Sequence, residues 1–252
     1  MRVPEAGTGY SRSVIVPSLS LVVPAYDEED CLPALYGRVV EVFGAARAWE
    51  LILVDDGSRD RTAAVIRELS DKDPRVRARI LTQHCGQTTA LRVGIAAARG
   101  ALVATLDADL QNDPADLLEM LEVLGEDDAI VGYRSERHDD WLRRASSRVA
   151  NAIRNSVTGD RIRDTGCSLK LFRTEAIRAI PLFDGMHRFL PTLLRFHGYR
   201  VSEHPVSHRA RRAGVSKYGV RNRAFRAFGD LLAVRWMRSR IVSPEVRDSD
   251  AS

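Results

Sequence analysis

Short apolar runs alternate along the chain with longer segments in which hydrophobic residues recur every three or four positions. The runs hold four to six residues, which is typical of buried strands, and the longer segments have the spacing of amphipathic helices. In the first half this pattern predicts strands at 19–24, 50–54, 77–82, 101–106 and 129–132. It predicts helices at 32–43, about 60–69, 86–99 (with Gly100 as its C-cap) and 114–124. Such alternation favours an α/β fold with a doubly wound, mostly parallel sheet flanked by helices.

The second half of the chain is less regular. Its pattern predicts helices at 141–157, 174–180, 186–197 and 220–241, and strands at 167–173 and 199–204. We expect one domain at 19–219, preceded by a loose leader (1–18) and followed by an amphipathic basic helix (220–242) and a polar tail (243–252). The leader lacks the continuous apolar core of a signal peptide, and no run approaches the ~20 apolar residues that span a bilayer.

The apolar run at 101–106 ends in two carboxylates, Asp107 and Asp109, with Gln111 close behind. A parallel strand delivers such side chains to the carboxyl edge of the sheet, where open α/β sheets bind ligands. Alternation along an extended chain places both carboxylates on one side. Because two neighbouring carboxylates repel each other, a hard divalent cation that also binds a diphosphate would relieve the repulsion. An isolated Asp-x-Asp is more often a solvated loop with a helix cap, so the motif needs support from other segments.

Acidic residues follow two further predicted strands, as Asp27-Glu28 and as Asp55-Asp56. In a parallel sheet all three strand ends lie on one edge, which indicates a single site. Asp55 and Asp56 can accept hydrogen bonds from a base or a ribose, although Asp-Gly-Ser is also prone to form turns. The chain contains neither G-x-G-x-x-G nor G-x-x-x-x-G-K-[ST], which disfavours a dinucleotide oxidoreductase or a P-loop enzyme.

Charge and cysteine content narrow the class of protein further. The 252 residues are 44% hydrophobic and carry a formal charge of +4. The stretch from 205 to 240 contains ten Arg or Lys residues and only one acidic residue. The three cysteines stand far apart without CxxC spacing, which predicts neither a disulfide framework nor a zinc site and fits a reducing cytosol.

Seven segments, in the same order, resemble the family 2 glycosyltransferases of GT-A fold, and within them the dolichyl- and polyprenyl-phosphate sugar synthases. The resemblance covers about residues 19–235, and Asp27 and His84 stand where the family pattern usually has Asn. The segments are VVPAYDEE (22–29), LVDDGSRDRT (53–62), GQTTALRVGIAAARG (86–100), LDADLQNDP (106–114), GYR (132–134), DTGCSLKLFR (164–173) and RRAGVSKYG (211–219). Many relatives also carry C-terminal membrane helices, which this sequence does not contain.

The resemblance implies roles for individual residues. The nucleotide-base pocket would be lined by Pro24, Tyr26 and Glu28, with Asp56 nearby. The metal ion, Mg²⁺ or Mn²⁺, would be held against the donor diphosphate by Asp107, Asp109 and Gln111. The positions that match the family's acceptor-phosphate site are Arg134, Arg143 and Ser147. The loop that closes over the phosphates would contain Arg211, Ser216 and Lys217.

The resemblance further implies an inverting transfer of a hexosyl group, with mannose as the first expectation. The donor would be a GDP- or UDP-linked sugar, and the acceptor polyprenyl or dolichyl phosphate at the cytoplasmic membrane face. The chemistry agrees, because a metal neutralises a departing diphosphate, and an anionic phosphate nucleophile needs cationic positioning rather than a base. Arg143 and Ser147 share one face of a predicted helix, and Arg grips phosphate bidentately. We therefore expect a single displacement without a covalent enzyme intermediate.

Two other functions stay open at the level of sequence. A saccharide hydroxyl acceptor in cell-envelope polysaccharide synthesis would require a carboxylate base, and Asp139, Asp140 and Asp164 are candidates. A basic module that binds nucleic acid would suit the arginine-rich C-terminal stretch, but acidic strand ends repel phosphate, so we expect no nucleic-acid partner.

The segment at 220–241 has apolar residues among its arginines. This pattern predicts either an interfacial helix on an anionic membrane surface or a helix packed on the domain. We expect peripheral association with the inner face of the membrane. This expectation is compatible with a separate membrane-embedded partner.

Overall fold

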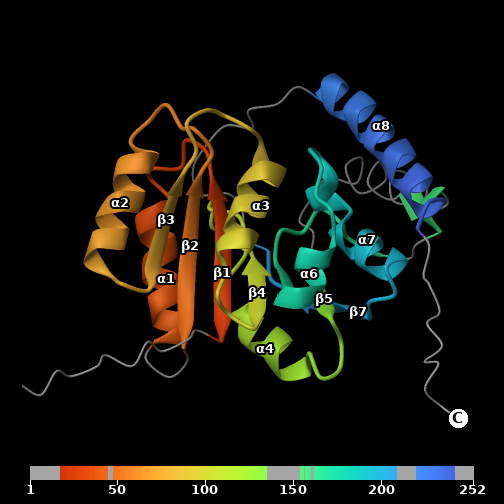
Figure 1. The fold of residues 1–252 in the computed structure, drawn as a ribbon. Coiled ribbons are helices and arrows are strands. Elements are labelled where there is room, and N and C mark those ends of the chain that lie inside the picture. Colours follow the sequence, from red (N-terminus) through yellow and green to blue (C-terminus); the bar gives the residue numbers. More distant parts are fainter. Residues whose placement is uncertain are drawn as a thin grey trace, which may run out of the picture.

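The computed structural model describes residues 18–44, 48–134, 154–155, 157–159, 162–208 and 220–241, with the side chains of the last range described from residue 229. These residues form one sheet with helices on both faces (Figure 1). The strands are β1 (Leu19–Ala25), β2 (Trp49–Asp55), β3 (Val76–Ile80), β4 (Leu102–Thr105), β5 (Ala129–Arg134), β6 (Lys170–Arg173) and β7 (Val201–Val206). The helices are α1 (Leu32–Phe43), α2 (Thr62–Lys72), α3 (Gln87–Ala97), α4 (Asp116–Val123), α6 (Thr174–Ala179), the short 3-10 helix η1 (Met186–Arg188), α7 (Leu190–Phe196) and α8 (Val220–Arg238).

The described sheet has seven strands in the order β3-β2-β1-β4-β6-β5-β7. Strands β1 to β4 are parallel to one another, and β7 is parallel to β5. Strand β6 runs antiparallel to both of its neighbours, β4 and β5. The predicted α/β architecture with a mostly parallel sheet is thus confirmed, and the reversed strand β6 is an addition that the sequence pattern did not indicate.

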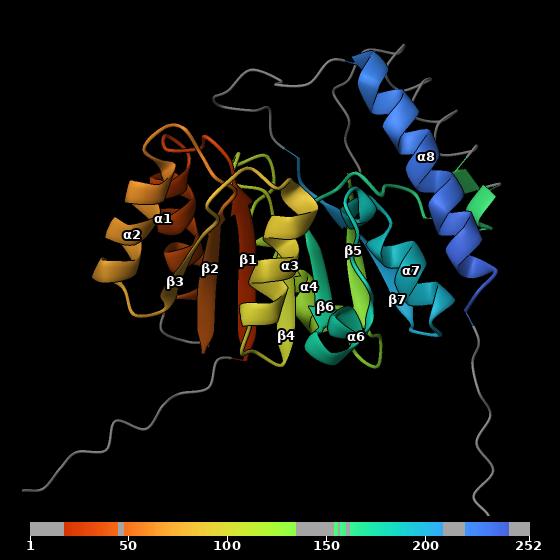
Figure 2. The same ribbon diagram turned by 45° about the horizontal axis from the view of Figure 1, so that its top comes forward.

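Two apolar layers hold the helices against the sheet. Along β1, Leu21 and Val23 point to the layer shared with α1, α2 and α4, whereas Val22 points to the layer shared with α3, α6, α7 and α8. Figure 2 shows α3, α6 and α7 in front of the sheet and α4 behind it. Because the central strands are covered on both faces, their sequences are continuous apolar runs, as expected for parallel strands in doubly wound folds.

Several element boundaries differ from the sequence prediction. Residues 186–197 form η1 and then α7 instead of one helix, and the strand predicted at 167–173 begins only at Lys170. Gly100 is not the C-cap of α3, because the helix ends at Ala97 and Ala98 leaves it in an extended conformation (ψ 143°). A β-carbon at Gly100 would instead lie 2.8 Å from the backbone nitrogen of Ser20 in β1, so this glycine permits close approach of two backbones.

Helix α3 packs closely on the centre of the sheet through Gly94. A β-carbon there would collide with the side chain of Val22 and lie 3.2 Å from Val54 Cγ2. Glycine is a poor helix former, so its presence in α3 is explained by this contact, which brings the N-terminus of α3 close to the carboxyl edge of the sheet.

Gly94→Ala should therefore destabilise the protein by about 1–3 kcal/mol, because overpacking outweighs the gain in helix propensity. The control is Gly37→Ala in α1, where a β-carbon would meet nothing within 4 Å, and this change should stabilise by about 0.5–1 kcal/mol. Urea unfolding measures both free energies, and stabilisation by Gly94→Ala would contradict the packing argument.

Candidate functional site

The acidic loop, residues 107–113, follows β4 and lies at the carboxyl edge of the sheet, beside the ends of β1 and β2. Asp107 is half-buried and its Oδ1 accepts a hydrogen bond from Gln87 Nε2 at the start of α3 (2.8 Å). Asp109 is only 5% exposed, and its Oδ1 accepts a hydrogen bond from the backbone N–H of Gln111 (3.2 Å). The extended chain ends at Asp107, because residues 108–109 form a turn and Leu110 has φ of +60°. Strand alternation therefore does not determine how Asp107 and Asp109 are oriented.

The residue types in this loop fit a magnesium or manganese ion. Asp107, Asp109 and the amide of Gln111 offer only hard oxygen ligands, which both ions prefer. Within the described ranges, no group of three or more His, Cys, Asp or Glu side chains could hold a metal. Mg²⁺ is usually bound by one or two carboxylates together with substrate phosphates, and Asp107 and Asp109 offer two.

The acids after β2 shape the neighbouring loops. Asp55 and Asp56 are each 2% exposed, and Asp55 accepts hydrogen bonds from the backbone N–H (3.2 Å) and hydroxyl of Ser58. Asp56 accepts hydrogen bonds from the N–H groups of Cys85 (2.8 Å) and Gly86 (2.9 Å). Asp55 therefore has the turn-forming role that the sequence left open, whereas Asp56 fixes the loop between β3 and α3.

The loop after β1 faces the loop before α3. The rings of Tyr26 and His84 lie 4.2 Å apart at a tilt of 39°, and His84 Nδ1 lies 2.9 Å from Asp56 Oδ2. Glu28 is anchored through its backbone N–H to Thr62 Oγ1 (2.8 Å). Pro24 pairs with β2 beyond the last residue of β1 that pairs with β4. Its missing N–H therefore interrupts no hydrogen bond to β4.

The thiol of Cys31, immediately before α1, is unreactive at neutral pH. Burial raises the pKa of Cys31 to about 11, and the hydrogen bond and negative charge of Glu28 and the charge of Asp109 act in the same direction. Cys31 therefore remains a thiol at neutral pH and cannot act as a nucleophile.

On the other side of β4, Arg134 at the end of β5 forms a bidentate ion pair with Asp164 (Nε–Oδ2 2.7 Å, Nη2–Oδ1 3.0 Å). Asp164 is 5% exposed and also accepts a hydrogen bond from the N–H of Gly166 (3.1 Å). An arginine pair of this kind stabilises the ionised carboxylate. Asp164 is therefore poorly suited to be the general base that a saccharide acceptor would need.

Several predicted site residues lie outside the described residues and stay predictions. They are Arg143, Ser147, Arg211, Ser216 and Lys217, together with the alternative bases Asp139 and Asp140. Arg154, near the end of the helix predicted at 141–157, is described and is 6% exposed, donating to Thr165 Oγ1 (2.5 Å). This arginine supports the segment that contains Asp164.

Two basic groups near the site, one buried and one partly buried, were missed by the sequence reasoning. Lys170 at the start of β6 is 5% exposed and donates to the carbonyl of Cys167, and burial lowers its pKa against the opposing charges of Cys167, Asp107 and Asp164. His187 Nδ1 lies 2.8 Å from Thr88 Oγ1. The sequence signal that could have identified Lys170 is its position as a lysine within an otherwise apolar strand. The sequence of η1 contains no comparable signal for His187.

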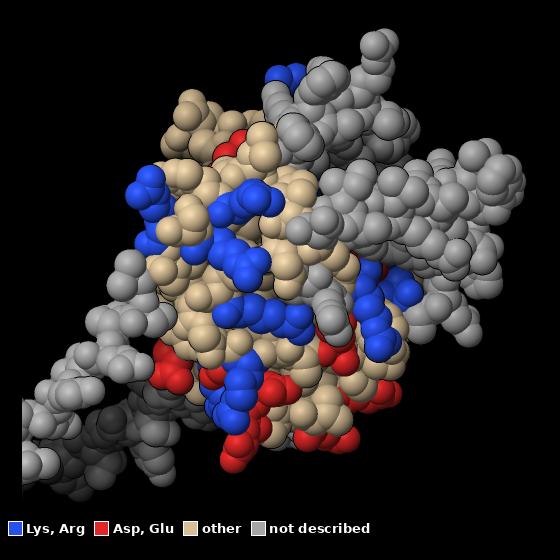
Figure 3. Space-filling view, turned by 90° about the vertical axis from the view of Figure 1, so that its right-hand side faces the viewer, with Lys and Arg blue, Asp and Glu red and all other residues tan. Residues whose placement is uncertain are grey.

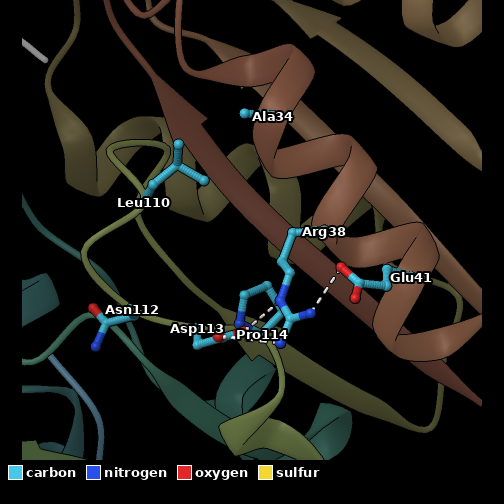
Figure 4. A pocket seen from close by; sticks show the side chains of 7 residues that line it. All are labelled: Ala34, Arg38, Glu41, Leu110, Asn112, Asp113 and Pro114. Carbon is cyan, nitrogen blue, oxygen red and sulfur yellow. Dashed lines mark hydrogen bonds and ion pairs between the residues drawn. The ribbon is translucent and has the colours of Figure 1, made fainter. Parts of the chain in front are cut away.

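A hollow of about 380 Å³ lies between α1 and the end of the acidic loop (Figure 4). Its lining includes Leu110, Asn112 and Asp113 but neither Asp107 nor Asp109. Arg38 reaches from α1 to Asp113 across it, with Nε–Oδ1 and Nη2–Oδ2 distances of 2.9 and 3.2 Å. The hollow therefore borders the acidic loop on the side of α1, and this ion pair fixes the loop there.

Comparisons with known proteins point to one family. The family model described as glycosyl transferase family 2 matches residues 20–180. The chain is 43% identical over 223 residues to a dodecaprenyl-phosphate galacturonate synthase of Rhizobium johnstonii (86% of this chain, 66% of the relative). It is 37% identical over 205 residues to an undecaprenyl-phosphate 4-deoxy-4-formamido-L-arabinose transferase of Edwardsiella ictaluri (80% of this chain, 63% of the relative). The chain thus spans slightly less than two thirds of the length of these relatives.

Solved structures share the fold at low sequence identity. A mannosyltransferase of Pyrobaculum calidifontis, in complex with GDP-Man and Mn²⁺, superposes with a TM-score of 0.61 at 18% identity (92% of this chain, 67% of that one). Glucosyl-3-phosphoglycerate synthase of Mycobacterium tuberculosis, in complex with Mn²⁺, UDP-glucose and phosphoglyceric acid, gives 0.62 at 17% identity (90% and 81%). The expected GT-A fold is confirmed.

The partly buried His187 makes the stability of the protein depend on pH. Burial, helped by the charges of Arg188 and Lys170, lowers the pKa of His187 from 6.5 to about 3. Thr88 Oγ1 accepts the N–H of Gly185 (3.0 Å), so its hydroxyl is left to donate to the neutral ring. As pH falls from about 6.5 towards 3, the unfolded chain takes up a proton that the folded chain does not, and stability is lost.

Between pH 7 and pH 5 the free energy of unfolding should therefore fall by on the order of 1–2 kcal/mol through His187 alone. In His187→Gln this part of the pH dependence should disappear, whereas His197→Gln, whose native ring faces the carbonyl of Leu193, should keep it. Urea titrations at several pH values measure the slopes; equal slopes in wild type and His187→Gln would rule out the assignment.

Proposed function

Because the chain belongs to glycosyl transferase family 2, we propose that it moves a sugar from a nucleotide-diphosphate sugar to a polyprenyl phosphate. Residues 19–219 form the catalytic domain of this proposal. Its relatives at 43% and 37% identity are named for transfer to dodecaprenyl and undecaprenyl phosphate. The proposal extends the activity named for these relatives to a chain that spans about two thirds of the relatives' length.

The observation that carries the proposal is the contrast between the two sides of β4. The loop at the end of β4, next to β1, carries the carboxylates Asp107 and Asp109, which suit a metal-bound diphosphate. The side towards β5 presents Arg134, and its described carboxylate, Asp164, is buried and paired. A hydroxyl acceptor needs a carboxylate base, whereas a lipid phosphate is already an anion. The described residues therefore favour an acceptor that brings its own negative charge.

The donor is placed along the carboxyl edge of the sheet. Its base lies near Pro24, Tyr26 and Glu28, in the pocket whose far wall, the loop of His84, is held by Asp56. Its diphosphate lies at the acidic loop, where a bound Mg²⁺ or Mn²⁺ would neutralise the charge that develops on the leaving group. Asp107, Asp109 and Gln111 would hold that ion, and Arg211 and Lys217 would close over the phosphates.

The acceptor approaches from the side of β5. A phosphate oxygen of the lipid attacks the anomeric carbon as the bond from that carbon to the diphosphate oxygen breaks, and the electron pair leaves with the nucleoside diphosphate. Arg134, Arg143 and Ser147 orient the attacking phosphate. One displacement inverts the anomeric configuration, and no enzyme nucleophile takes part, consistent with the protonated thiol of Cys31.

The relatives with high sequence identity are a better guide to the transferred sugar than the solved structures that share only the fold. Mannose was the first expectation, but a galacturonate synthase is the 43% identical relative. The mannosyltransferase resembles this chain at 18% identity, which carries the fold and not the substrate. We therefore place a uronic acid ahead of mannose, with the nucleotide, UDP or GDP, to be determined.

Helix α8 supplies a surface for the lipid bilayer. Leu231 and Val234 are buried against the body, and the carboxylate of Asp230 lies against Gly185. On the opposite face of the helix, Leu232 and Trp236 are 49% and 62% exposed. The packed helix and the interfacial helix of the sequence prediction thus correspond to two faces of α8.

Basic residues complete this outward face. Arg235 and Arg240 are exposed, and the Arg240 guanidinium lies 5.9 Å from the centre of the Trp236 ring. Figure 3, which views the side of the molecule that carries α7 and α8, shows Lys and Arg spread over this face and acids mostly along its lower edge. Every described helix is too short or too polar to span a bilayer. We therefore propose that the protein docks peripherally on the cytoplasmic face of an anionic membrane through α8.

The catalytic proposal predicts that Asp109→Ala lowers turnover at least about a hundredfold, because stabilisation of the leaving group is lost. The Tm should stay within about 4 °C of wild type. Asp71→Ala, which removes an exposed carboxylate from α2, is the control and should be fully active. Activity of Asp109→Ala comparable to wild type would refute the metal assignment.

The assay for that comparison is release of nucleotide from a panel of UDP- and GDP-linked sugars, with Mn²⁺ and undecaprenyl phosphate, and identification of the lipid product. Galacturonate and mannose donors belong in the panel. Product formed on saccharide hydroxyls and not on the lipid phosphate would favour the alternative acceptor.

The docking proposal predicts that Leu232→Ser with Trp236→Ser weakens binding to vesicles of anionic phospholipid by roughly tenfold or more, because two half-exposed apolar side chains no longer enter the interface. Val123→Ser, at a residue of α4 with 54% exposure, is the matched control. Sedimentation with vesicles measures the partition, and raised salt should weaken it through the arginines. Unchanged sedimentation of the double variant would exclude α8 as the docking face.

A further inference from the structure

The segment that precedes β6 crosses the end of β4 and binds the acidic loop at both of its ends. The hydroxyl of Ser168 accepts a hydrogen bond from the backbone N–H of Asp107 (3.2 Å) and donates to Asn112 Oδ1 (3.0 Å). The carbonyl of Ser168 accepts a hydrogen bond from Thr105 Oγ1 (2.8 Å) in β4. One residue, 61 positions from Asp107 in the sequence, thus spans the loop that holds both candidate metal-binding carboxylates.

The groups around Ser168 are themselves held in place. Thr105 and Asn112 are 3% and 7% exposed, and the amide of Asn112 also points to the sulfur of Cys167 (3.8 Å). Next in the chain, the carbonyl of Leu169 accepts the N–H of Gly132 in β5 (2.9 Å). Ser168 therefore acts from a fixed backbone, and its hydroxyl can turn away from the loop only by breaking its own hydrogen bonds to Asp107 and Asn112.

The other side of the loop is fixed from α1. Arg38 holds Asp113 through two hydrogen bonds, and Figure 4 shows Asn112 placed away from α1 while Asp113 faces Arg38. Between Ser168 and Arg38 the chain makes its sharp turn at Leu110, a non-glycine residue with φ of +60°. Such a conformation persists only where the surroundings impose it, and these contacts on two sides of the loop are the surroundings that do so.

We infer that Ser168 is a positioning residue for the metal-binding loop: its hydroxyl joins Asp107 to Asn112 and so sets the conformation of the loop before the ion and donor arrive. The ion meets carboxylates that are already placed, and little ordering of the loop opposes binding. The inference rests on the proposed metal-dependent function and assigns part of the metal affinity to a residue that is not itself a ligand.

The same short segment also reaches the acceptor side. Four residues before Ser168, Asp164 holds Arg134, and two residues after it, Lys170 donates to the carbonyl of Cys167. Residues 164–170 therefore connect the loop for the donor with the arginine for the acceptor. Removal of the Ser168 hydroxyl leaves the Arg134–Asp164 pair intact, so its effect on the acceptor should be smaller than its effect on the metal.

The test is Ser168→Ala, with Ser168→Thr as the variant that restores the hydroxyl. The control is Ser70→Ala, which removes a partly buried hydroxyl that donates to the carbonyl of Val76 (3.1 Å) near β3. Titration calorimetry with Mn²⁺ in the presence of UDP, and separately of GDP, measures metal affinity without turnover. Steady-state kinetics then separates the Mn²⁺ requirement from kcat.

Ser168→Ala should raise the Kd for Mn²⁺ by about tenfold or more, the usual effect of losing a group that supports metal ligands. At saturating Mn²⁺, kcat should recover to within about threefold of wild type, and the Tm should stay within about 4 °C. Ser168→Thr and Ser70→Ala should bind Mn²⁺ within about threefold of wild type. A change of up to about threefold is well below the tenfold effect expected from the loss of a supporting group.

Two results are decisive in different ways. Equal Mn²⁺ affinity of Ser168→Ala and wild type would overturn the inference and leave the proposed function standing. Failure of the wild type to bind Mn²⁺ with either nucleotide would overturn the metal assignment of the proposed function as well. A loss in Ser168→Ala that Ser168→Thr does not restore would assign the effect to packing instead of to the hydroxyl.

Discussion

The position of β4 between a parallel and an antiparallel neighbour is the constraint on which the rest of the site depends. On one side β4 pairs with β1, so its acidic end lies beside the ends of β1 and β2. On the other side it pairs with β6 in the opposite direction, so the segment that leads into β6 lies beside that same acidic end. The acidic loop and the segment that contains Asp164 and Ser168 therefore lie side by side because one strand of the sheet is reversed.

This arrangement separates the roles of the acidic residues. Asp55 and Asp56 are buried and bind N–H groups of nearby loops, which keeps in place the loops around the proposed base site. Asp164 is buried and holds the guanidinium of Arg134 in position. Asp107 and Asp109 belong to the loop whose oxygen ligands suit a metal ion. Buried carboxylates need such partners because an unpaired charge in the protein interior is costly. Asp55, Asp56 and Asp164 therefore also hold the backbone and side chains around the candidate site.

The described basic residues are divided in a similar way. Arg38 binds the carboxylate of Asp113 and Arg154 the carbonyl of Ile162, and Arg238 fastens α8 to the body through the carbonyl of Thr158 (2.7 Å) and the ring of Phe196. Arg235 remains exposed on α8, and Arg240 is exposed just after the helix ends. A count of arginines along the sequence therefore overstates the charge available to a lipid surface, whereas the position of each arginine on its helix identifies the face that can meet one.

The sequence by itself determined the elements, the edge of the sheet that carries the acids, and the family. Helix α1 begins and ends where its apolar spacing predicts, because that periodicity reflects burial of one face and is local. The direction of β6, the pairing of Arg134 with Asp164 and the contacts of Ser168 were decided only by the tertiary structure. These contacts join residues 30 to 71 positions apart, and no local pattern of hydrophobic and polar residues specifies which distant partner a buried polar group will meet.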